Sequence, residues 1–280
     1  MLDARLRPFH LRTMFPLFTK TFPGSAAELA VALNESLERI LMLPAQPVSV
    51  RGGEYPAIEQ LQISLDGAQL RPNAPRPAVA AGETIPALRV QEFAISGRGL
   101  SFAGATGDVS LNAEEVRLNS GRSDAGEIVL VLRSARNGRV RVATSKAALE
   151  TVIAHLAKAE AGKHGVTIDG VRLNLQASGP RALAAEVQLR AKKLFLSASL
   201  RIAAKLDLDE DLNAKISGLR CEGEGAIASM ACGVLDPHLQ KLDGRVFPLM
   251  ALPLGEIRLR DVRLAVGDEI AVTAEFGAAA

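Results

Sequence analysis

Residues 193–208, KLFLSASLRIAAKLDL, decide the fold class expected for this chain. Every even position in this run carries an aliphatic side chain, whereas the odd positions are mostly small or charged. Successive side chains of a β-strand point to opposite faces, so this period of two indicates a long strand with one apolar face. At about 3.3 Å per residue such a strand would span roughly 50 Å. The acidic turn at 207–211 would then reverse the chain.

The same alternation continues on both sides of this run. The hairpin signal Asn137-Gly138 and several other glycines separate its segments. Residues 71–86 hold four prolines and predict a loop. The remaining expected strands occupy 48–51, 166–175, 182–189, 212–216, 257–266 and 270–276, with a series of short strands between 87 and 143.

Three segments have the apolar spacing of amphipathic helices: 25–42, 145–161 and 226–242. Ser25 and Glu28 form a capping box at the start of the first helix. Pro237 is expected to kink or interrupt the third helix. The sequence therefore predicts an α+β fold in which long, curved antiparallel β-sheets pack around amphipathic helices.

A weak internal repeat suggests two related halves. The first and second helices each lead into the pattern V-x-V/I-x-G, at Val48–Gly52 and Val166–Gly170. The predicted organisation is a basic, apolar N-terminal arm at 1–22, a first helix-plus-strands half at 23–143 and a second at 144–280. The arm is expected to pack on the body; the alternative is a basic amphipathic segment that touches an anionic membrane.

Composition restricts the classes of partner. The formal net charge is only +2, so strong binding to nucleic acid is not expected. Aromatic residues make up 4% of the chain, with no Trp, so few rings are available to stack on sugars or bases. The two cysteines, Cys221 and Cys232, favour free buried thiols over one bridge. No transmembrane helix and no signal peptide are recognisable, which predicts a cytoplasmic protein. A periplasmic or exported protein with a trimmed N-terminus would look the same.

The sequence contains no recognisable catalytic or metal-binding motif. The histidines lack metal-ligand spacing, and Cys221, Cys232 and His238 match no zinc pattern. The acidic turn at 207–211 lacks the register of a calcium loop, so it is interpreted as a solvated hairpin tip. Neither a nucleophile elbow nor a phosphate-binding loop is present. The prediction is a protein that is not an enzyme and uses no cofactor or metal.

The second half resembles a known family. Residues 245–276, RVFPLMALPLGEIRLRDVRLAVGDEIAVTAEF, follow an apolar helix and end in a polar turn and a last strand. This arrangement is similar to the C-terminal part of the LmeA-type phospholipid-binding family, over about 145–276. That family belongs to the tubular lipid-binding (TULIP) superfamily. The resemblance implies long curved sheets wrapped about a helix, an apolar tunnel for acyl chains, lipid binding or transfer, and no catalysis.

These observations predict a protein that binds a phospholipid or fatty acid in an apolar tunnel. A tunnel of aliphatic side chains would gain about 0.8 kcal/mol for each methylene that it buries. The alternative is a non-catalytic structural or scaffolding β-protein that binds a protein partner through an edge strand or the N-terminal arm. The residues expected to contact the lipid are Leu149, Val152, Ile153, Leu156, Leu196, Leu200, Ile202, Ile227, Met230, Val234 and Phe247.

Overall fold

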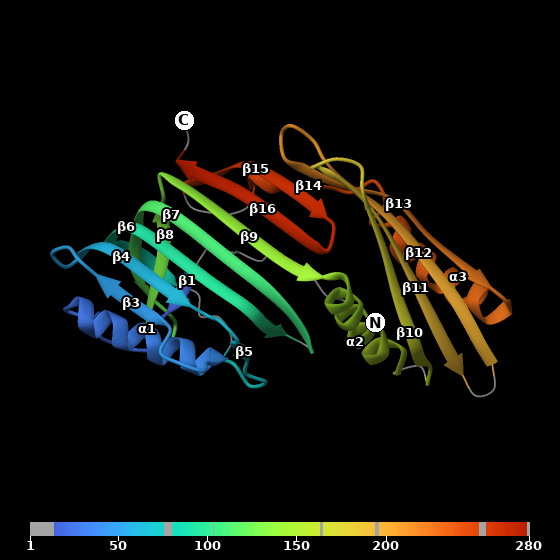
Figure 1. The fold of residues 1–280 in the computed structure, drawn as a ribbon, viewed down its shortest axis with the longest axis horizontal. Coiled ribbons are helices and arrows are strands. Elements are labelled where there is room, and N and C mark those ends of the chain that lie inside the picture. Colours follow the sequence, from blue (N-terminus) through green and yellow to red (C-terminus); the bar gives the residue numbers. More distant parts are fainter. Residues whose placement is uncertain are drawn as a thin grey trace.

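A computed structural model describes residues 14–75, 80–102, 104–162, 165–193, 196–251 and 256–278. These residues form two β-sheets that lie side by side along the long axis of the molecule, with three α-helices packed against them (Figure 1). The described part of the chain is therefore an α+β structure dominated by antiparallel sheet, as the alternating pattern predicts.

The first sheet is the larger of the two, with eleven strands among the described residues. They are β1 (Met14–Pro16), β2 (Leu41–Met42), β3 (Val48–Arg51), β4 (Ala57–Ser64), β5 (Gln69–Leu70), β6 (Ala81–Phe102), β7 (Ala105–Arg122), β8 (Ile128–Ser134), β9 (Asn137–Ser145), β15 (Ile257–Val266) and β16 (Glu269–Ala278). The main strand order is β15-β16-β9-β7-β6-β4-β3. Neighbouring strands are antiparallel, except that β4 and β5 run parallel to β6.

The short strands expected between 87 and 143 are partly joined into longer ones. β6 and β7 are 22 and 18 residues long, and β6 begins at Ala81, inside the segment predicted as a loop. The register between them shifts near Gly97 and Gly99 instead of ending there. A β-bulge adds a residue to one strand and lets pairing resume. Glycines that looked like strand separators therefore lie within continuous strands.

The second sheet has five strands in the order β10-β11-β12-β13-β14. They are β10 (Thr167–Ala177), β11 (Ala182–Lys193), β12 (Leu196–Leu208), β13 (Asn213–Glu224) and β14 (Val246–Pro248), and the short 3₁₀ helix η1 (Leu249–Ala251) follows. The run 193–208 is therefore shared between two strands: Lys193 ends β11, and β12 begins at Leu196. The reversal at the acidic turn before β13 is confirmed.

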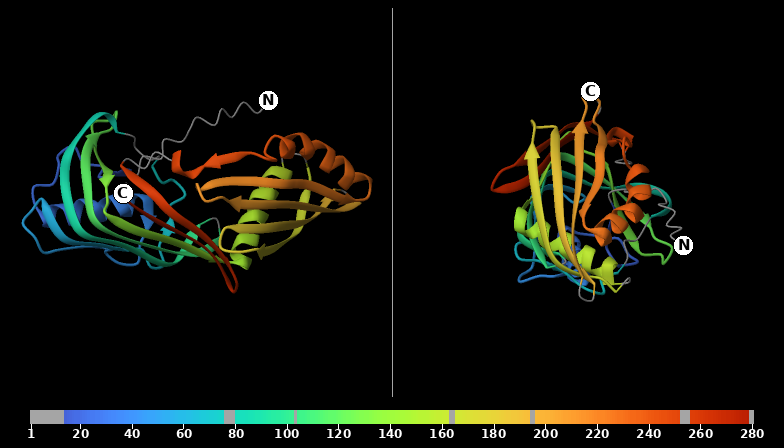
Figure 2. Two further views of the ribbon diagram at one scale, coloured as in Figure 1. Left: turned by 90° about the horizontal axis from the view of Figure 1, so that it is seen from above. Right: turned by 90° about the vertical axis from the view of Figure 1, so that its right-hand side faces the viewer.

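The three helices are α1 (Ala26–Ile40), α2 (Lys146–Gly162) and α3 (Ala226–Gln240). The Oγ atom of Ser25 accepts the backbone N–H of Glu28 at 3.2 Å, which confirms the predicted cap. α1 packs against the first sheet, α2 against β10 and α3 against β13 (Figure 2). Pro237 lies within α3, so it does not break the helix.

A disulfide joins Cys221 in β13 to Cys232 in α3. The prediction of free thiols is therefore wrong. The two cysteines are 11 residues apart, but the turn between β13 and α3 folds the helix back onto its own strand and brings their Cα atoms within 5.3 Å. The helix also approaches β13 closely, because a Cβ atom on Gly223 would collide with Ala228. The pair fastens α3 to the second sheet.

The closing strands return to the first sheet. β16 pairs with β9 from Ser145 to Asn137, so residues 257–278 complete a sheet whose other strands come from the first half of the chain. β15 and β16 lie in the predicted second half of the chain but belong to the first sheet. The boundary between the two sheets therefore differs from the predicted division at residue 144. The backbone N–H of Leu264 in β15 donates to the carbonyl of Pro180 at 2.6 Å, which connects β15 to the turn between β10 and β11.

An ion pair reinforces this junction between the sheets. Arg181, beside that turn, lies 2.7 Å from the carboxylate of Asp261 in β15. Hydrogen bonds from Arg181 and then from Arg263 lower the pKa of Asp261. The side chain of Asp261 is only 15% exposed, so solvent screens this pair less than the other ion pairs of the surface.

Replacing Asp261 by Asn is expected to lower the free energy of unfolding by about 1 kcal/mol at neutral pH, because two guanidinium groups lose a charged acceptor and one of its two oxygens. A carboxylate with a lowered folded-state pKa contributes stability above its unfolded-state pKa and loses it as the pH falls through the folded-state value. The difference between wild type and Asp261→Asn should therefore be constant above the unfolded-state pKa of about 3.9 and should shrink as the pH falls below it. Urea unfolding across that range measures it, and a difference that does not shrink at low pH would contradict it.

Residues 14–22 of the N-terminal arm pack on the body. β1 pairs with β8, Leu17 is buried, and Phe15 contacts the core of the first sheet. This part of the arm confirms the first of the two interpretations. Residues 1–13, on which the membrane-touching alternative depends most, lie outside the described residues.

Candidate functional site

An apolar cavity of about 290 Å³ lies between α1 and the first sheet. Leu33 and Leu37 of α1 form one wall, and the sheet supplies the others. The lining contains no charged and no hydrogen-bonding side chain. The sheet and arm residues around it are Phe15, Leu61, Ile63, Leu65, Phe93, Ile95, Leu111, Ala113, Val116, Leu118, Leu130, Leu132, Ala135 and Phe276.

The alternation of the strands explains why this lining is uniformly apolar. Residues that face each other across an antiparallel pair point to the same side of a sheet. Phe93 faces Ala113, Ala113 faces Gly138, and Gly138 faces Phe276. We call this side, which carries α1, the inner face. Gly138 has no side chain, and the ring of Phe276 occupies the place that a Cβ atom there would take.

The space beside the N-terminal half of α1 is filled. Leu29, Ile58 and Val90 are at most 3% exposed and belong to the same apolar core, yet none of them lines the cavity. Phe93, Leu111 and Phe276, in contrast, are only partly buried. Free volume is thus restricted to the C-terminal half of α1, where large apolar side chains retain accessible surface.

The apolar surface extends beyond the cavity along the inner face. One row of facing residues runs through Ile95, Leu111, Val140, Ala274 and Val262. The next row contains Val109, Val142, Val272 and Leu264. Val142 and Val272 are 51% and 43% exposed, although they face each other in the middle of the sheet. These exposed aliphatic side chains extend the apolar surface beyond the cavity.

These rows end in a cluster that links the two sheets. Val262 and Leu264 of β15 pack with Leu206 and Leu208 of β12 and with Phe247 of β14. The second sheet continues the pattern, because Val187 faces both Leu173 and Ile202, and Leu189 faces both Val171 and Leu200. An apolar surface therefore runs from the cavity across β9, β16 and β15 to the second sheet.

The residues predicted to contact lipid whose side chains the structure describes lie around the second sheet, and none of these lines the cavity beside α1. Leu149, Val152 and Ile153 of α2 are partly buried, and Leu156 is 63% exposed. Leu200 belongs to a small cluster under α3, next to Ile202 on the same face, and Phe247 belongs to the cluster between the sheets. The side chains of Leu196, Ile227, Met230 and Val234 lie outside the described part of the structure.

Sequence reasoning missed the cavity in the first half, although its signals were present. Phe93 and Ile95 alternate, Val109 and Leu111 alternate, and Leu33 and Leu37 lie on the apolar stripe of the first helix. The same pattern describes a solid core and a lined cavity equally well. Only the packing of α1 on the sheet distinguishes them.

Within the described residues, no group of His, Cys, Asp and Glu side chains is arranged to hold a metal ion. The one tyrosine, Tyr55, donates a hydrogen bond of 2.6 Å to the carbonyl of Pro23, and its pKa is raised by burial and by the nearby Glu28. It lies beside the N-terminus of α1, away from the cavity lining. The chemistry available at the cavity is therefore apolar contact.

No protein-family model, no curated protein and no solved structure matches this chain. Among the described helices, none is long and apolar enough to cross a bilayer.

Proposed function

We propose that the protein binds the acyl chain of a fatty acid or phospholipid in the cavity between α1 and the first sheet. The observation that carries this proposal is a cavity with a completely apolar lining that continues into exposed aliphatic rows at Val142 and Val272. Water in such a cavity would find no hydrogen-bonding side chain, so it would not be stabilised there. A hydrocarbon chain would be stabilised, because its apolar surface would be removed from water.

The cavity volume defines how much of a ligand could be enclosed. At about 290 Å³ it lies at the lower limit of small-molecule sites, which span roughly 300–1,000 Å³. It is suited to the end of one acyl chain. The rest of the chain would lie along the aliphatic rows towards the second sheet, where Leu206 and Phe247 continue the apolar surface.

The proposal agrees in kind with the resemblance to the LmeA-type family, which implies an apolar tunnel formed by curved sheets about a helix. It differs in position, because the free volume beside α1 belongs to the first half of the chain. In this interpretation the first sheet wraps around α1 and the ligand lies between them. The α2 and α3 residues expected from the sequence would line the far end of the same surface.

We also propose that the protein works in an oxidising compartment. The disulfide between Cys221 and Cys232 supports this, because disulfides persist outside the reducing cytosol. The periplasmic or exported alternative is therefore favoured over the cytoplasmic one. Labelling of free thiols in protein taken directly from cells tests this proposal, and two reactive thiols would contradict it.

Ligand identity is tested by extracting the purified protein with organic solvent and analysing the extract by mass spectrometry. The expected result is a co-purified fatty acid or phospholipid in a stoichiometric amount. Protein that carries no lipid and does not bind a fluorescent fatty acid would contradict lipid binding. If such protein instead captured a protein partner, the scaffolding alternative would be favoured.

Affinity should rise with chain length in a series of saturated fatty acids. Each additional buried methylene contributes about 0.8 kcal/mol, so two methylenes should strengthen binding roughly fifteenfold. Displacement of a fluorescent fatty acid measures this series. We expect the gain to stop once the chain is longer than the apolar path, whereas an affinity that is independent of length from the shortest chain onwards would contradict the proposed site.

A further inference from the structure

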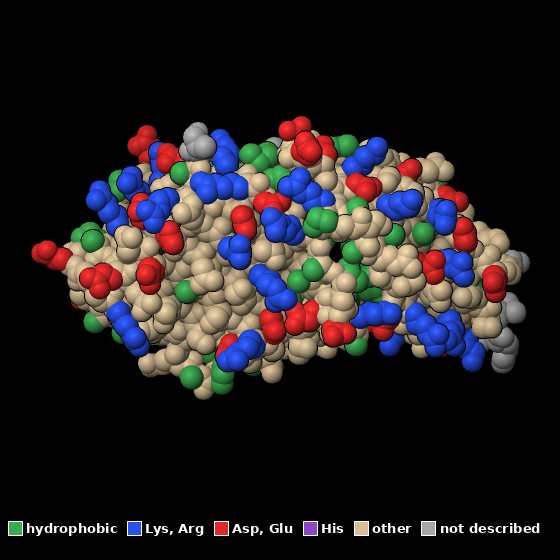
Figure 3. Space-filling view, turned by 45° about the horizontal axis from the view of Figure 1, so that its top comes forward, with side chains coloured by type: hydrophobic (Ala, Val, Ile, Leu, Met, Phe, Trp, Pro, Cys, Tyr) green, Lys and Arg blue, Asp and Glu red, His purple; other side chains and the backbone are tan. Residues whose placement is uncertain are grey.

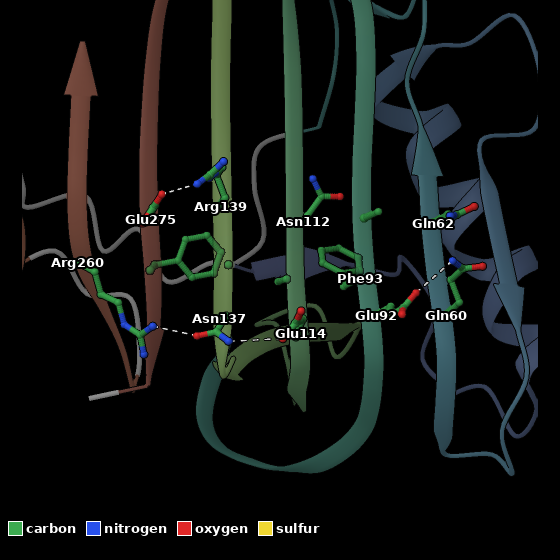
Figure 4. A pocket seen from close by; sticks show the side chains of 14 residues that line it. Gln60, Gln62, Glu92, Phe93, Asn112, Glu114, Asn137, Arg139, Arg260 and Glu275 are labelled. Atoms are coloured by element: carbon green, nitrogen blue, oxygen red, sulfur yellow. Dashed lines mark hydrogen bonds and ion pairs between the residues drawn. The ribbon is translucent and has the colours of Figure 1, made fainter. Parts of the chain in front are cut away.

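The outer face of the first sheet, opposite α1, carries a second hollow of about 530 Å³ (Figure 4). Its side chains come from β4, β6, β7, β9, β15 and β16. Its polar side chains occupy the strand positions that alternate with those of the apolar cavity. Phe93, Ala113 and Phe276 border both hollows, although their side chains belong to the inner face. A single layer of sheet therefore separates a polar groove from an apolar cavity.

One row of facing residues crosses the middle of this groove. It runs through Gln62, Ala94, Asn112, Arg139 and Glu275. Neighbouring strands lie about 4.8 Å apart, so Gln62 and Asn112 are separated by roughly 10 Å. The small side chain of Ala94 lies between them, which leaves room for a ligand above the sheet.

Most charged groups around the groove already have partners. Arg139 lies 2.6 Å from Glu275, and Arg260 donates to the side-chain oxygen of Asn137 at 2.9 Å (Figure 4). Glu114 accepts hydrogen bonds from Asn137 and from Arg136, which lower the pKa of its carboxyl group. These contacts hold the polar side chains in fixed positions. They also leave no unpaired cation among the lining residues for an anionic ligand.

Two carboxamides of the groove have no partner among the described residues. Gln62 and Asn112 make no hydrogen bond there, and Gln60 makes only a long one, of 3.4 Å, to Glu92. A carboxamide offers two N–H donors and one carbonyl acceptor. Gln62 and Asn112 therefore present matched donors and acceptors to the groove, on a rigid sheet.

We propose that this groove binds a neutral, polyhydroxylated ligand of the oligosaccharide class. Each hydroxyl group of a sugar both donates and accepts, so it complements the free carboxamides of Gln62 and Asn112. The ion pairs make a charged ligand a poor fit, because it would have to compete with groups already joined. The rings of Phe93 and Phe276 lie beneath the groove on the inner face of the sheet, so the contacts to the ligand would come from the carboxamides.

The size of the groove favours a small ligand over a protein partner. A stable protein interface buries about 800 Å² on each side and usually has an apolar centre. Most side chains that line this groove are polar, and acidic and basic side chains are mixed over the face of the molecule that Figure 3 shows. The centre of the groove lies on β6, β7 and β9, which pair with neighbours on both sides, so no free strand edge is available there to pair with a peptide.

NMR titration of the ¹⁵N-labelled protein tests the proposal, with cellotetraose, maltotetraose and chitotetraose as probes at millimolar concentrations. The expected result is that at least one probe shifts the side-chain amide signals of Gln62 and Asn112. Asn112→Ala and Gln62→Ala should each weaken that binding about tenfold, since each removes a hydrogen-bonding group. Ser96→Ala, in β6 on the same face but outside the groove lining, serves as the matched control and should bind as wild type does.

The absence of shifts with all three sugars would overturn the proposal. It would also be overturned if the Asn112→Ala, Gln62→Ala double variant bound the sugar as tightly as wild type, as followed by the remaining signals of the groove. Groove signals that respond to an unstructured peptide but to no sugar would also overturn it, in favour of a peptide site. Fatty-acid binding is measured in the same samples. The two sites lie on opposite faces of the sheet, so either can fail while the other is retained.

Discussion

Replacing Ala113 by Phe is expected to weaken fatty-acid binding about a hundredfold. Ala113 lies on the inner face of β7, is 7% exposed and lines the apolar cavity between Phe93 and Gly138. The added ring would fill space that about four methylenes of a ligand would otherwise occupy. At about 0.8 kcal/mol each this is a loss of roughly 3 kcal/mol, or two powers of ten in the dissociation constant. Displacement of a fluorescent fatty acid measures the loss.

The matched control places the same ring on the opposite side of the same sheet. Ser96 faces Ser110 on the outer face, so Ser96→Phe adds an equal volume that cannot reach the cavity. Its fatty-acid affinity should equal that of wild type. Thermal unfolding checks that Ala113→Phe is folded. Its midpoint should equal or exceed that of wild type, because filling a cavity with an apolar group maintains or raises stability. A folded Ala113→Phe protein with unchanged affinity would exclude the cavity as the binding site.

Removing the disulfide should have the largest effect on stability. In the Cys221→Ala, Cys232→Ala variant we expect the free energy of unfolding to fall by about 3 kcal/mol, the chain-entropy value for a closed loop of this length. The cross-link spans 11 residues and fastens α3 to β13. The loss should appear as a midpoint of thermal unfolding roughly 5 °C lower.

Reduction of the wild-type protein supplies the control for this prediction. A reducing agent should lower the midpoint of wild type to that of the double variant and leave the variant unchanged. Equal stability of oxidised wild type and variant would contradict the prediction. Because the cavity beside α1 shares no residue with α3 or β13, fatty-acid binding should survive the double substitution.

Several features could be predicted because they depend on neighbours in sequence. The cap at Ser25 joins residues three positions apart, and the apolar stripe of α1 repeats every three or four residues. The return of the chain at the acidic turn before β13 is equally local. These contacts join residues that are close in sequence and do not depend on the rest of the chain. The sequence pattern that predicts each of them therefore lies within a single segment.

Features that depend on distant residues could not be predicted. Gly97 and Gly99 resemble strand ends in the sequence, but they lie at a register shift because β7 continues to pair with β6 beyond them. Cys221 and Cys232 resemble independent buried thiols until α3 folds back onto β13. The closing strand β16 pairs with β15 of its own half on one side, but its other neighbour is β9, so it completes the first sheet.

The sequence by itself determined which face of each strand is apolar, since side-chain alternation is fixed by backbone geometry alone. It also determined where the helices begin and that acyl-chain binding is the chemistry to test. The tertiary structure decided where apolar faces leave space between them. Alternation assigns a side chain to a face but does not specify what packs opposite it. Leu29, Leu33 and Leu37 are all buried, but only Leu33 and Leu37 border the free volume that the side chains of the sheet leave open.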